Sequence, residues 1–403
     1  TQEGVFGVPL RVSTTYVFLF ILFGAFLKHG RLGELYNEVA VSIAGGLKGG
    51  PAKVAVISSS LLGTISGSAV ANVSTSGSFT IPMMIRAGYS RVVAGAVESL
   101  ASTGSQIVPP IMGAAAFIMA ELTGISYWSI ALAAIVPALV YYIAVYSVVH
   151  YEAVRLNLDT TYDERKPFFR LFFTKCYMFI PIVVIIYFLA TGHSISMSAM
   201  TAIVTCFIIS AVPLVFSGNW RELEIFLNAL EDGAKNCVSV AIPCAIAGII
   251  VGVITLSALG LKFTGMILGI SGGNLVIILI MTSFICLILG MGMPTSAAYI
   301  TVAVLAIPAL IKAGLEPITA HFFGFYFANL SMITPPVALA AYAAAGISGA
   351  NASKVGIKAC YLGMAIYALP FLFATYPSLL LVGSLPRTLM EFLKVGAIVV
   401  SFC

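Results

Sequence analysis

Four polar stretches interrupt an otherwise apolar sequence, and their residue types suit the binding of ions. Each combines Gly or Pro with hydroxyl or amide side chains, and the four are 63–72, 102–110, 290–297 and 329–336. Proline breaks a helix, and the residue before it leaves the helical region. The freed carbonyl groups, together with Ser, Thr and Asn oxygens, suit a small hard cation. Freed helix N-termini carry N–H groups and partial positive charge, which suit an anion.

The same residues also have a purely structural interpretation. Gly, Ser and Pro are common in membrane helices, where small residues allow close packing. For a single break that interpretation would be favoured. Four breaks that are paired by an internal repeat favour a functional site, because lipid tolerates broken backbone only where protein or a wet cavity covers it.

The composition indicates that lipid surrounds much of the chain. Of the 403 residues, 60% are hydrophobic and 9% are charged, and the mean hydropathy is +1.07. Soluble domains carry about 25% charged residues, and a soluble fold could not cover this much apolar surface. About 20 apolar residues span a bilayer as a helix, and the runs that approach this length are 5–27, 126–149, 173–191, 196–217, 236–260 and 355–382. We therefore expect an all-α polytopic membrane protein.

An internal repeat relates the two halves of the chain. Residues 81–118 align without a gap on residues 307–344, an offset of 226, with 12 identities in 38 positions. The identities include Pro109-Pro110, which falls on Pro335-Pro336. The sequence therefore predicts two repeats, each with a helical hairpin and a broken helix: 51–86 with 90–121, and 274–312 with 316–345.

The basic residues predict that the repeats are inverted in the membrane. Cytoplasmic loops carry an excess of Lys and Arg, so the basic segment 151–175 is assigned to the cytoplasm. Of the 20 Lys and Arg residues, the five then left outside are Arg11, Lys262, Lys312, Arg387 and Lys394. This count requires both hairpins to be re-entrant and to open on opposite faces. Inverted repeats with broken helices at the midplane are typical of secondary transporters.

The predicted organisation has four parts. Residues 1–150 form inverted repeat 1 with a partial scaffold, and residues 151–175 form a cytoplasmic linker. Residues 176–382 form inverted repeat 2, in which the amphipathic segment 219–235 is an interfacial arm helix. Residues 383–403 are expected to begin a further segment of a longer, truncated polypeptide.

Several of these motifs resemble a known transporter family. The first half resembles the large membrane subunit of tripartite ATP-independent periplasmic (TRAP) transporters at Ser66-Gly67-Ser68-Ala69, Ile81-Pro82, Ala87-Gly88-Tyr89 and Pro109-Pro110. The second half resembles it at 290–308 and 329–336, and 106–117 is most similar to the fused permease of the TAXI subfamily. The resemblance implies an elevator-type transporter of the ion-transporter superfamily, which carries substrate and sodium past a scaffold. It also implies a periplasmic substrate-binding protein and a small membrane subunit, separate or fused and missing here.

The resemblance also assigns site residues by position. The first sodium site is Ser66, Gly67, Asn72, Ser102, Thr103 and Ser105, and its mirror is Met293, Thr295, Ser296, Asn329, Ser331 and Thr334. The substrate would lie between the hairpin tips, at Ser66, Ser68, Asn72, Pro109, Thr295, Ser296 and Pro335. No catalytic residue and no cofactor is expected, and sodium is the coupling ion.

The few ionisable side chains within apolar stretches receive a structural interpretation. We expect Glu98 near the cytoplasmic surface, bonded to a helix end, with a functional role at membrane depth as the alternative. Glu121 and the histidines are expected near the ends of spans, the histidines being His29, His150, His193 and His321. The seven cysteines form no metal-binding pattern and are interpreted as small buried residues.

The expected function is sodium-driven uptake of small carboxylates across a bacterial or archaeal inner membrane, with delivery by the binding protein. The alternatives are a dicarboxylate/sodium symporter that takes substrate from bulk water and a channel with two half-helix filters. An enzyme is disfavoured because the sequence lacks HExxH and GxSxG motifs. Nucleic acid is not an expected partner, because the basic residues of this +5 chain lie in loops between spans. Substrate identity, sodium or proton coupling, and oligomeric state stay open.

Overall fold

The computed structural model is helical through most of the residues that it describes, which are 4–30, 32–158, 168–217, 221–382 and 385–403. No strand forms among these residues. The first half holds α1 (Val8–Val12), η1 (Ser13–Val17), α2 (Phe18–His29), α3 (Leu32–Ala44), α4 (Gly50–Gly63), α5 (Ala69–Arg86), α6 (Arg91–Thr103), η2 (Gly104–Ile107), α7 (Ala114–Thr123) and α8 (Tyr127–Arg155).

The second half begins with the helices that join the two repeats. These are α9 (Phe168–Lys175), η3 (Cys176–Phe179), α10 (Ile180–Ala190), α11 (Ile195–Ser217), α12 (Arg221–Leu256) and α13 (Leu259–Ser271). The remaining elements are α14 (Leu275–Gly290), α15 (Thr295–Leu305), α16 (Ile307–Lys312), α17 (Pro317–Leu330), α18 (Leu339–Ser348), α19 (Ala352–Leu362), α20 (Met364–Thr375), η4 (Pro377–Leu380) and α21 (Leu385–Phe402).

The bounds of the helices recur at the offset of the sequence repeat. α5 and α15 begin 226 residues apart, and so do α6 and α17. The turns after α5 and α16 contain Gly88 and Gly314, whose φ values of +95° and +98° favour glycine. Both Pro-Pro peptide bonds, Pro109-Pro110 and Pro335-Pro336, are cis. The two halves thus share an order of elements, while their opposite orientation in a membrane stays a prediction.

Several helices have the length and apolar character of membrane spans. The described residues contain three helices long and apolar enough to cross a bilayer: Val8–His29, Tyr127–Arg155 and Phe226–Leu256. α19 and α20 would add a fourth span, bent by 48° at its break. The other apolar helices have 10–17 residues, shorter than the roughly 20 that a span needs. The short apolar helices include α14 and α15 of the second hairpin and α7 and α18 of the two broken helices, so these elements do not count as full spans.

α12 is longer than the arm helix expected over 219–235. It runs without interruption from Arg221 to Leu256, because the apolar run that follows continues the helix instead of starting a new one. Residues 219 and 220, including Trp220 of the expected arm, lie outside the described residues. The same holds for 159–167 of the expected linker, which include Arg165 and Lys166.

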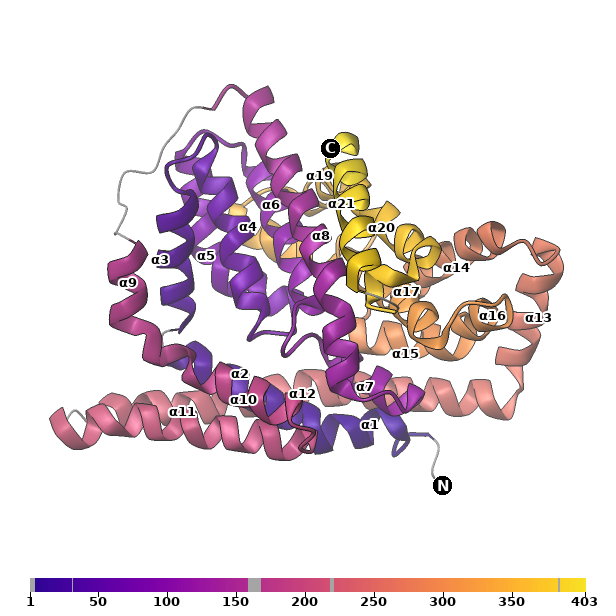
Figure 1. Ribbon diagram of the computed structural model, residues 1–403, viewed down its shortest axis with the longest axis horizontal. Helices are drawn as coiled ribbons and strands as arrows, with labels where there is room; N and C mark the ends of the chain where they lie inside the picture. Colours follow the sequence, from indigo (N-terminus) through magenta and orange to yellow (C-terminus); the bar gives the residue numbers. More distant parts are fainter. Residues whose placement is uncertain (1–3, 31, 159–167, 218–220, 383–384) are drawn as a thin grey trace.

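The two halves interlock through their broken helices. α4, α5 and α6 pack together beside α3 and α8, while α2, α10, α11 and α12 run across one edge of the molecule (Figure 1). α12 packs along α2 and reaches α15. α18 of the second half packs on α5 and α6, and α7 of the first half packs on α15. Each hairpin is therefore in contact with the broken helix of the other half.

We predict that the C-terminal ends of the two hairpins face opposite sides of the membrane. Ala87 and Ala313 are the matched caps of α5 and α16, with φ of −81° and −80°, so each position accepts a cysteine side chain. A membrane-impermeant thiol reagent should label Ala87→Cys from the cytoplasmic side only and Ala313→Cys from the outside only. The parent chain measures the background from native cysteines. Labelling of both positions from one side would refute the opposite orientation.

Candidate functional site

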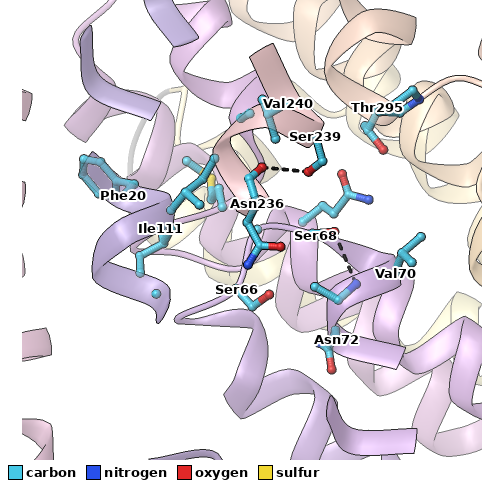
Figure 2. Close-up of a pocket in the computed structure, with 18 of the residues that line it drawn as sticks. Phe20, Ser66, Ser68, Val70, Asn72, Ile111, Asn236, Ser239, Val240 and Thr295 are labelled. Atoms are coloured by element: carbon cyan, nitrogen blue, oxygen red, sulfur yellow. Dashed lines mark hydrogen bonds between the residues drawn. The ribbon is translucent and has the colours of Figure 1, made fainter. Parts of the chain in front are cut away.

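A cavity of about 560 Å³ lies where the two hairpins, the two broken helices and α12 meet. We name the turn 64–68 the first tip and the turn 291–294 the second tip. The wall comes from α2, the first tip and the start of α5, residues 106–114, α12, the start of α15 and the break before α18 (Figure 2). Each of the four polar stretches noted in the sequence contributes at least one residue to this wall.

The first tip is pressed against the break that follows α6. A Cβ atom on Gly67 would lie 1.9 Å from the Met112 carbonyl oxygen, so the tip fits here only with glycine. Ser68 ends the tip and caps α5 by accepting a hydrogen bond from the Ala71 N–H at 3.3 Å. Ser66 and Ser68 both line the cavity (Figure 2). The tip therefore presents hydroxyl groups and the N-terminal end of α5 to the cavity.

A glycine at the end of the first hairpin arm contacts a serine of the broken helix in both halves. A Cβ atom on Gly63 would lie 2.8 Å from Ser105 Cα, and one on Gly290 would lie 2.4 Å from Ser331 Oγ. Ser331 also donates a hydrogen bond to the Gly290 carbonyl oxygen at 3.1 Å. The two serines lie 226 residues apart in the chain. Matched close contacts thus hold each hairpin on its own broken helix.

The two broken helices meet through polar groups. Asn329 Nδ2 donates a hydrogen bond to the Thr103 carbonyl oxygen at 3.0 Å. Asn329 and Ser105 are fully buried, yet Asn329 Oδ1 and Ser105 Oγ have no hydrogen-bond partner among the described residues. Leaving a buried polar atom unpaired costs about 1–3 kcal/mol, and neutral oxygens are the ligands that hard cations take. Both atoms are neutral oxygens of the chemical type that a hard cation takes.

The structure divides the predicted site residues into two groups. Those that line the cavity are Ser66, Gly67, Ser68, Asn72, Thr295 and Ser296. Those that are not part of its described wall are Ser102, Thr103, Ser105, Pro109, Met293, Asn329, Ser331, Thr334 and Pro335. The breaks contribute Gln106, Ile111 and Met332 to the wall instead of the two prolines. Thr334 bonds the Leu330 carbonyl oxygen at 2.7 Å and the Tyr367 hydroxyl at 2.6 Å.

Six polar wall residues were not predicted as site residues: Lys28, Ser74, Thr75, Gln106, Asn236 and Ser239. Asn236 and Ser239 lie three residues apart and so share one face of α12, and Ser239 Oγ donates to the Asn236 carbonyl oxygen at 2.7 Å (Figure 2). The sequence feature that could have indicated Asn236 and Ser239 is that both are polar and stand at the start of the apolar run 236–260. The whole run was counted as one candidate membrane span, so the pair was given no separate role.

Glu98 does not bond a helix end near the surface, contrary to the expectation. Its side chain is fully buried in the middle of α6. It accepts hydrogen bonds from the hydroxyl groups of Ser59 at 3.2 Å, Ser102 at 3.0 Å, Ser76 and Thr80. These four hydroxyls come from α4, α5 and α6, so one carboxyl group ties the first hairpin to the first broken helix. Ser102, predicted as a sodium ligand, is engaged in this cluster.

Asn72 links the Glu98 cluster to the cavity. Its Nδ2 donates to the Ser59 carbonyl oxygen at 3.0 Å, and its Oδ1 lies 3.1 Å from Ser76 Oγ, whose one hydroxyl proton is shared with Glu98. A primary amide has two N–H groups and two lone pairs on oxygen. One N–H group of Asn72 therefore has no partner among the described residues, and Asn72 lines the cavity.

Two further ionisable residues have defined partners. Glu121, at the end of α7, accepts from Arg11 at 2.7 Å and from the Tyr16 hydroxyl at 2.8 Å. His321 is buried in α17, and its Nδ1 lies 2.7 Å from the Tyr299 hydroxyl. His321 was expected near the end of a span, and it lies close to the start of α17, where the packing of α15 encloses it.

Comparisons with known proteins match nearly the whole chain. The family model described as Tripartite ATP-independent periplasmic transporter, DctM component, matches residues 2–388. The isethionate TRAP transporter permease protein DctMQ of Oleidesulfovibrio alaskensis is 24% identical over 377 residues, which cover 88% of this chain and 57% of that protein. The C4-dicarboxylate TRAP transporter large permease protein DctM of Vibrio cholerae is 24% identical over 380 residues, 89% of this chain and 82% of that protein. The 2,3-diketo-L-gulonate TRAP transporter large permease protein YiaN of Escherichia coli is 24% identical over 328 residues, 79% of this chain and 74% of that protein.

Proposed function

Because the chain belongs to the DctM component family of tripartite ATP-independent periplasmic transporters, we propose that it moves small organic anions across a bacterial or archaeal inner membrane. A periplasmic binding protein would deliver the substrate, and a small membrane subunit, separate or fused, would complete the scaffold. The observation that carries the proposal is the cavity at which both hairpins and both broken helices converge.

An anionic substrate is supported by the site and by the relatives. The first residues of α5 and α15 line the cavity, and helix N-termini favour negative charge. The relatives are named for isethionate, C4-dicarboxylates and 2,3-diketo-L-gulonate, which are all organic anions at neutral pH. We propose a small carboxylate for this chain and a TAXI-type binding protein as its partner.

Sodium is the proposed coupling ion. The buried oxygens Asn329 Oδ1 and Ser105 Oγ without partners among the described residues support a cation site between the broken helices. A sodium ion there would add positive charge between the two broken helices. Sodium and an anionic substrate would then each favour the binding of the other, which is the linkage that a symporter requires.

An elevator movement is the proposed mechanism. The cavity lies between the hairpins with their breaks on one side and α2 with α12 on the other. The Glu98 cluster joins α4, α5 and α6 by hydrogen bonds, which supports movement of the first hairpin and its broken helix as one body. α2 and α12, which pack along each other, would form part of the scaffold past which this body moves.

Uptake into proteoliposomes tests the proposed function. The permease is reconstituted with its small subunit and binding protein, and the substrate is a carboxylate selected by a ligand screen on the binding protein. We expect uptake only when the binding protein and an inward sodium gradient are both present. If one of the two is missing, uptake should fall to the level of protein-free liposomes. Equal uptake without the binding protein would favour a symporter that binds substrate from bulk water. Single-channel currents would favour a channel, and dependence on a proton gradient alone would refute sodium coupling.

A further inference from the structure

The cavity wall contains a charged residue that has no place in the predicted sites. Lys28, in the last turn of α2, is the one charged residue of the wall within the described part of the chain. The other polar wall residues carry neutral hydroxyl or amide groups, and they are Ser66, Ser68, Asn72, Ser74, Thr75, Gln106, Asn236, Ser239, Thr295 and Ser296. The electrostatic character of the cavity therefore depends on Lys28.

Lys28 is held by an ion pair that an anion can replace. Its Nζ lies 3.2 Å from Asp232 Oδ2 on α12, and the two side chains are 50% and 36% exposed. Ion pairs between exposed groups contribute only about 0.2–1 kcal/mol. Asp232 Oδ2 also lies 2.8 Å from His29 Nε2. If Lys28 turned toward a ligand, His29 would remain as a partner of Asp232, so the carboxylate would not be left alone.

We propose that Lys28 recognises the anionic group of the substrate and that Asp232 holds Lys28 in place while the cavity is empty. The inference rests on the proposed function and adds the residue that selects for negative charge. Asn236 lies four residues after Asp232 and therefore on the same face of α12. Its amide faces the cavity near Ser66 of the first tip (Figure 2). A cation and an amide on the α2 and α12 side would thus bind the substrate opposite the hydroxyl groups of the first tip.

A cysteine reporter in the wall measures the charge of the cavity without any need for transport. Ser74 lies on the exposed side of α5 and lines the cavity, and its hydroxyl bonds only its own helix, at the Val70 carbonyl oxygen. Ser74→Cys is made in the full chain in lipid nanodiscs. Its rate of modification is compared for a negatively charged and a positively charged methanethiosulfonate reagent, after subtraction of labelling in the chain without the new cysteine.

The quantity compared is the rate of modification by the negatively charged reagent divided by the rate for the positively charged one. We expect this ratio to fall several-fold in Lys28→Gln. Lys28→Arg should keep the ratio of the parent, and Asp232→Asn should raise it because Lys28 is then free of its partner. Lys312→Gln removes the same charge from the end of α16 and serves as the matched control, with no change expected. A ratio that is the same in Lys28→Gln and in the parent overturns the inference.

Protection by small anions supplies a second measurement on the same reporter. Succinate and isethionate should slow the modification of Ser74→Cys in the parent and in Lys28→Arg, and succinamide, which is uncharged, should not. In Lys28→Gln, protection should need a several-fold higher anion concentration than in the parent. Equal protection of the parent and of Lys28→Gln would overturn the inference. A Lys28-dependent ratio in a protein that shows no uptake would support the inference while refuting the proposed function.

Discussion

Replacement of Asn329 by alanine is expected to remove most of the stabilisation that sodium gives to the protein. The wild-type unfolding temperature should be higher in sodium chloride than in potassium chloride at equal ionic strength, because an ion that binds only the folded state stabilises it. Asn329→Ala deletes the buried Oδ1 that has no partner among the described residues and the Nδ2 that donates to the Thr103 carbonyl oxygen. The measurement is the unfolding temperature of the purified protein across a sodium titration.

The size of the effect follows from the burial of the amide. A lost hydrogen bond that water cannot replace costs about 1–3 kcal/mol, and a change of that size corresponds to roughly a five- to 150-fold change in affinity. The sodium concentration that gives half of the thermal shift should rise by a factor in that range. In the reconstituted complex, the sodium dependence of uptake should move in the same direction by a similar factor.

Asn351→Ala is the matched control for Asn329→Ala. Asn351 caps α19 by accepting a hydrogen bond from the Lys354 N–H at 3.1 Å, and it does not line the cavity. Loss of a helix cap costs about 1 kcal/mol, so the unfolding temperature should fall equally in sodium and in potassium. If Asn329→Ala behaves like Asn351→Ala and keeps the full sodium-specific shift, the assignment of the cation site is wrong.

The ends of the helices around the cavity could be predicted from local sequence. Proline, glycine and serine act on the backbone of their own turn, so their effects do not depend on the rest of the fold. α5 begins directly after Ser68, and the break after α17 contains Pro335-Pro336, as these rules require. The convergence of the four polar stretches on one cavity is a property of tertiary packing, and the repeat in the sequence was the indication of it.

The contribution of α2 and α12 to the site could not be predicted in the same way. Lys28 and Asn236 lie 208 residues apart in the chain, and neither belongs to a polar stretch that interrupts an apolar run. Each lies close to the end of an apolar run. A polar residue at that place is ordinarily interpreted as lying at the membrane surface. Only the packing of α12 along α2 shows that both face the cavity.

Glu98 shows a different limit of sequence reasoning. Its counterpart at the repeat offset is Gly324, where a Cβ atom would lie 2.8 Å from Ile307 Cδ1 and 3.0 Å from Val302 Cγ1. At this pair of positions the first hairpin is therefore joined to its broken helix by a carboxyl group and hydroxyls, and the second by close apolar packing. The alignment of Glu98 with Gly324 was visible in the sequence. The four hydroxyl partners were not, because they come from three separate helices.

Replacement of Gly67 by alanine is expected to displace the first tip and abolish uptake. The added methyl group would lie 1.9 Å from the Met112 carbonyl oxygen and 2.9 Å from Gly113 Cα, which are backbone atoms that no side-chain rotation can move. The opposing segment is itself fixed, because the Gly113 N–H donates to the Gln106 carbonyl oxygen at 2.8 Å. Overpacking of this kind costs about 1–3 kcal/mol or more. The measurements are the unfolding temperature and the uptake rate of the reconstituted complex.

Gly346→Ala provides the matched control for Gly67→Ala. Gly346 lies inside α18, and a Cβ atom there would meet nothing within 4 Å. Alanine in a helix interior is favoured over glycine by roughly 0.5–1 kcal/mol, so this variant should keep or raise the unfolding temperature and retain uptake. Gly67→Ala should lower the unfolding temperature and leave uptake at background. If Gly67→Ala transports at the wild-type rate, the close contact between the first tip and the break at Met112 is not required for transport. The assignment of the substrate site to the cavity between the two tips would then be wrong.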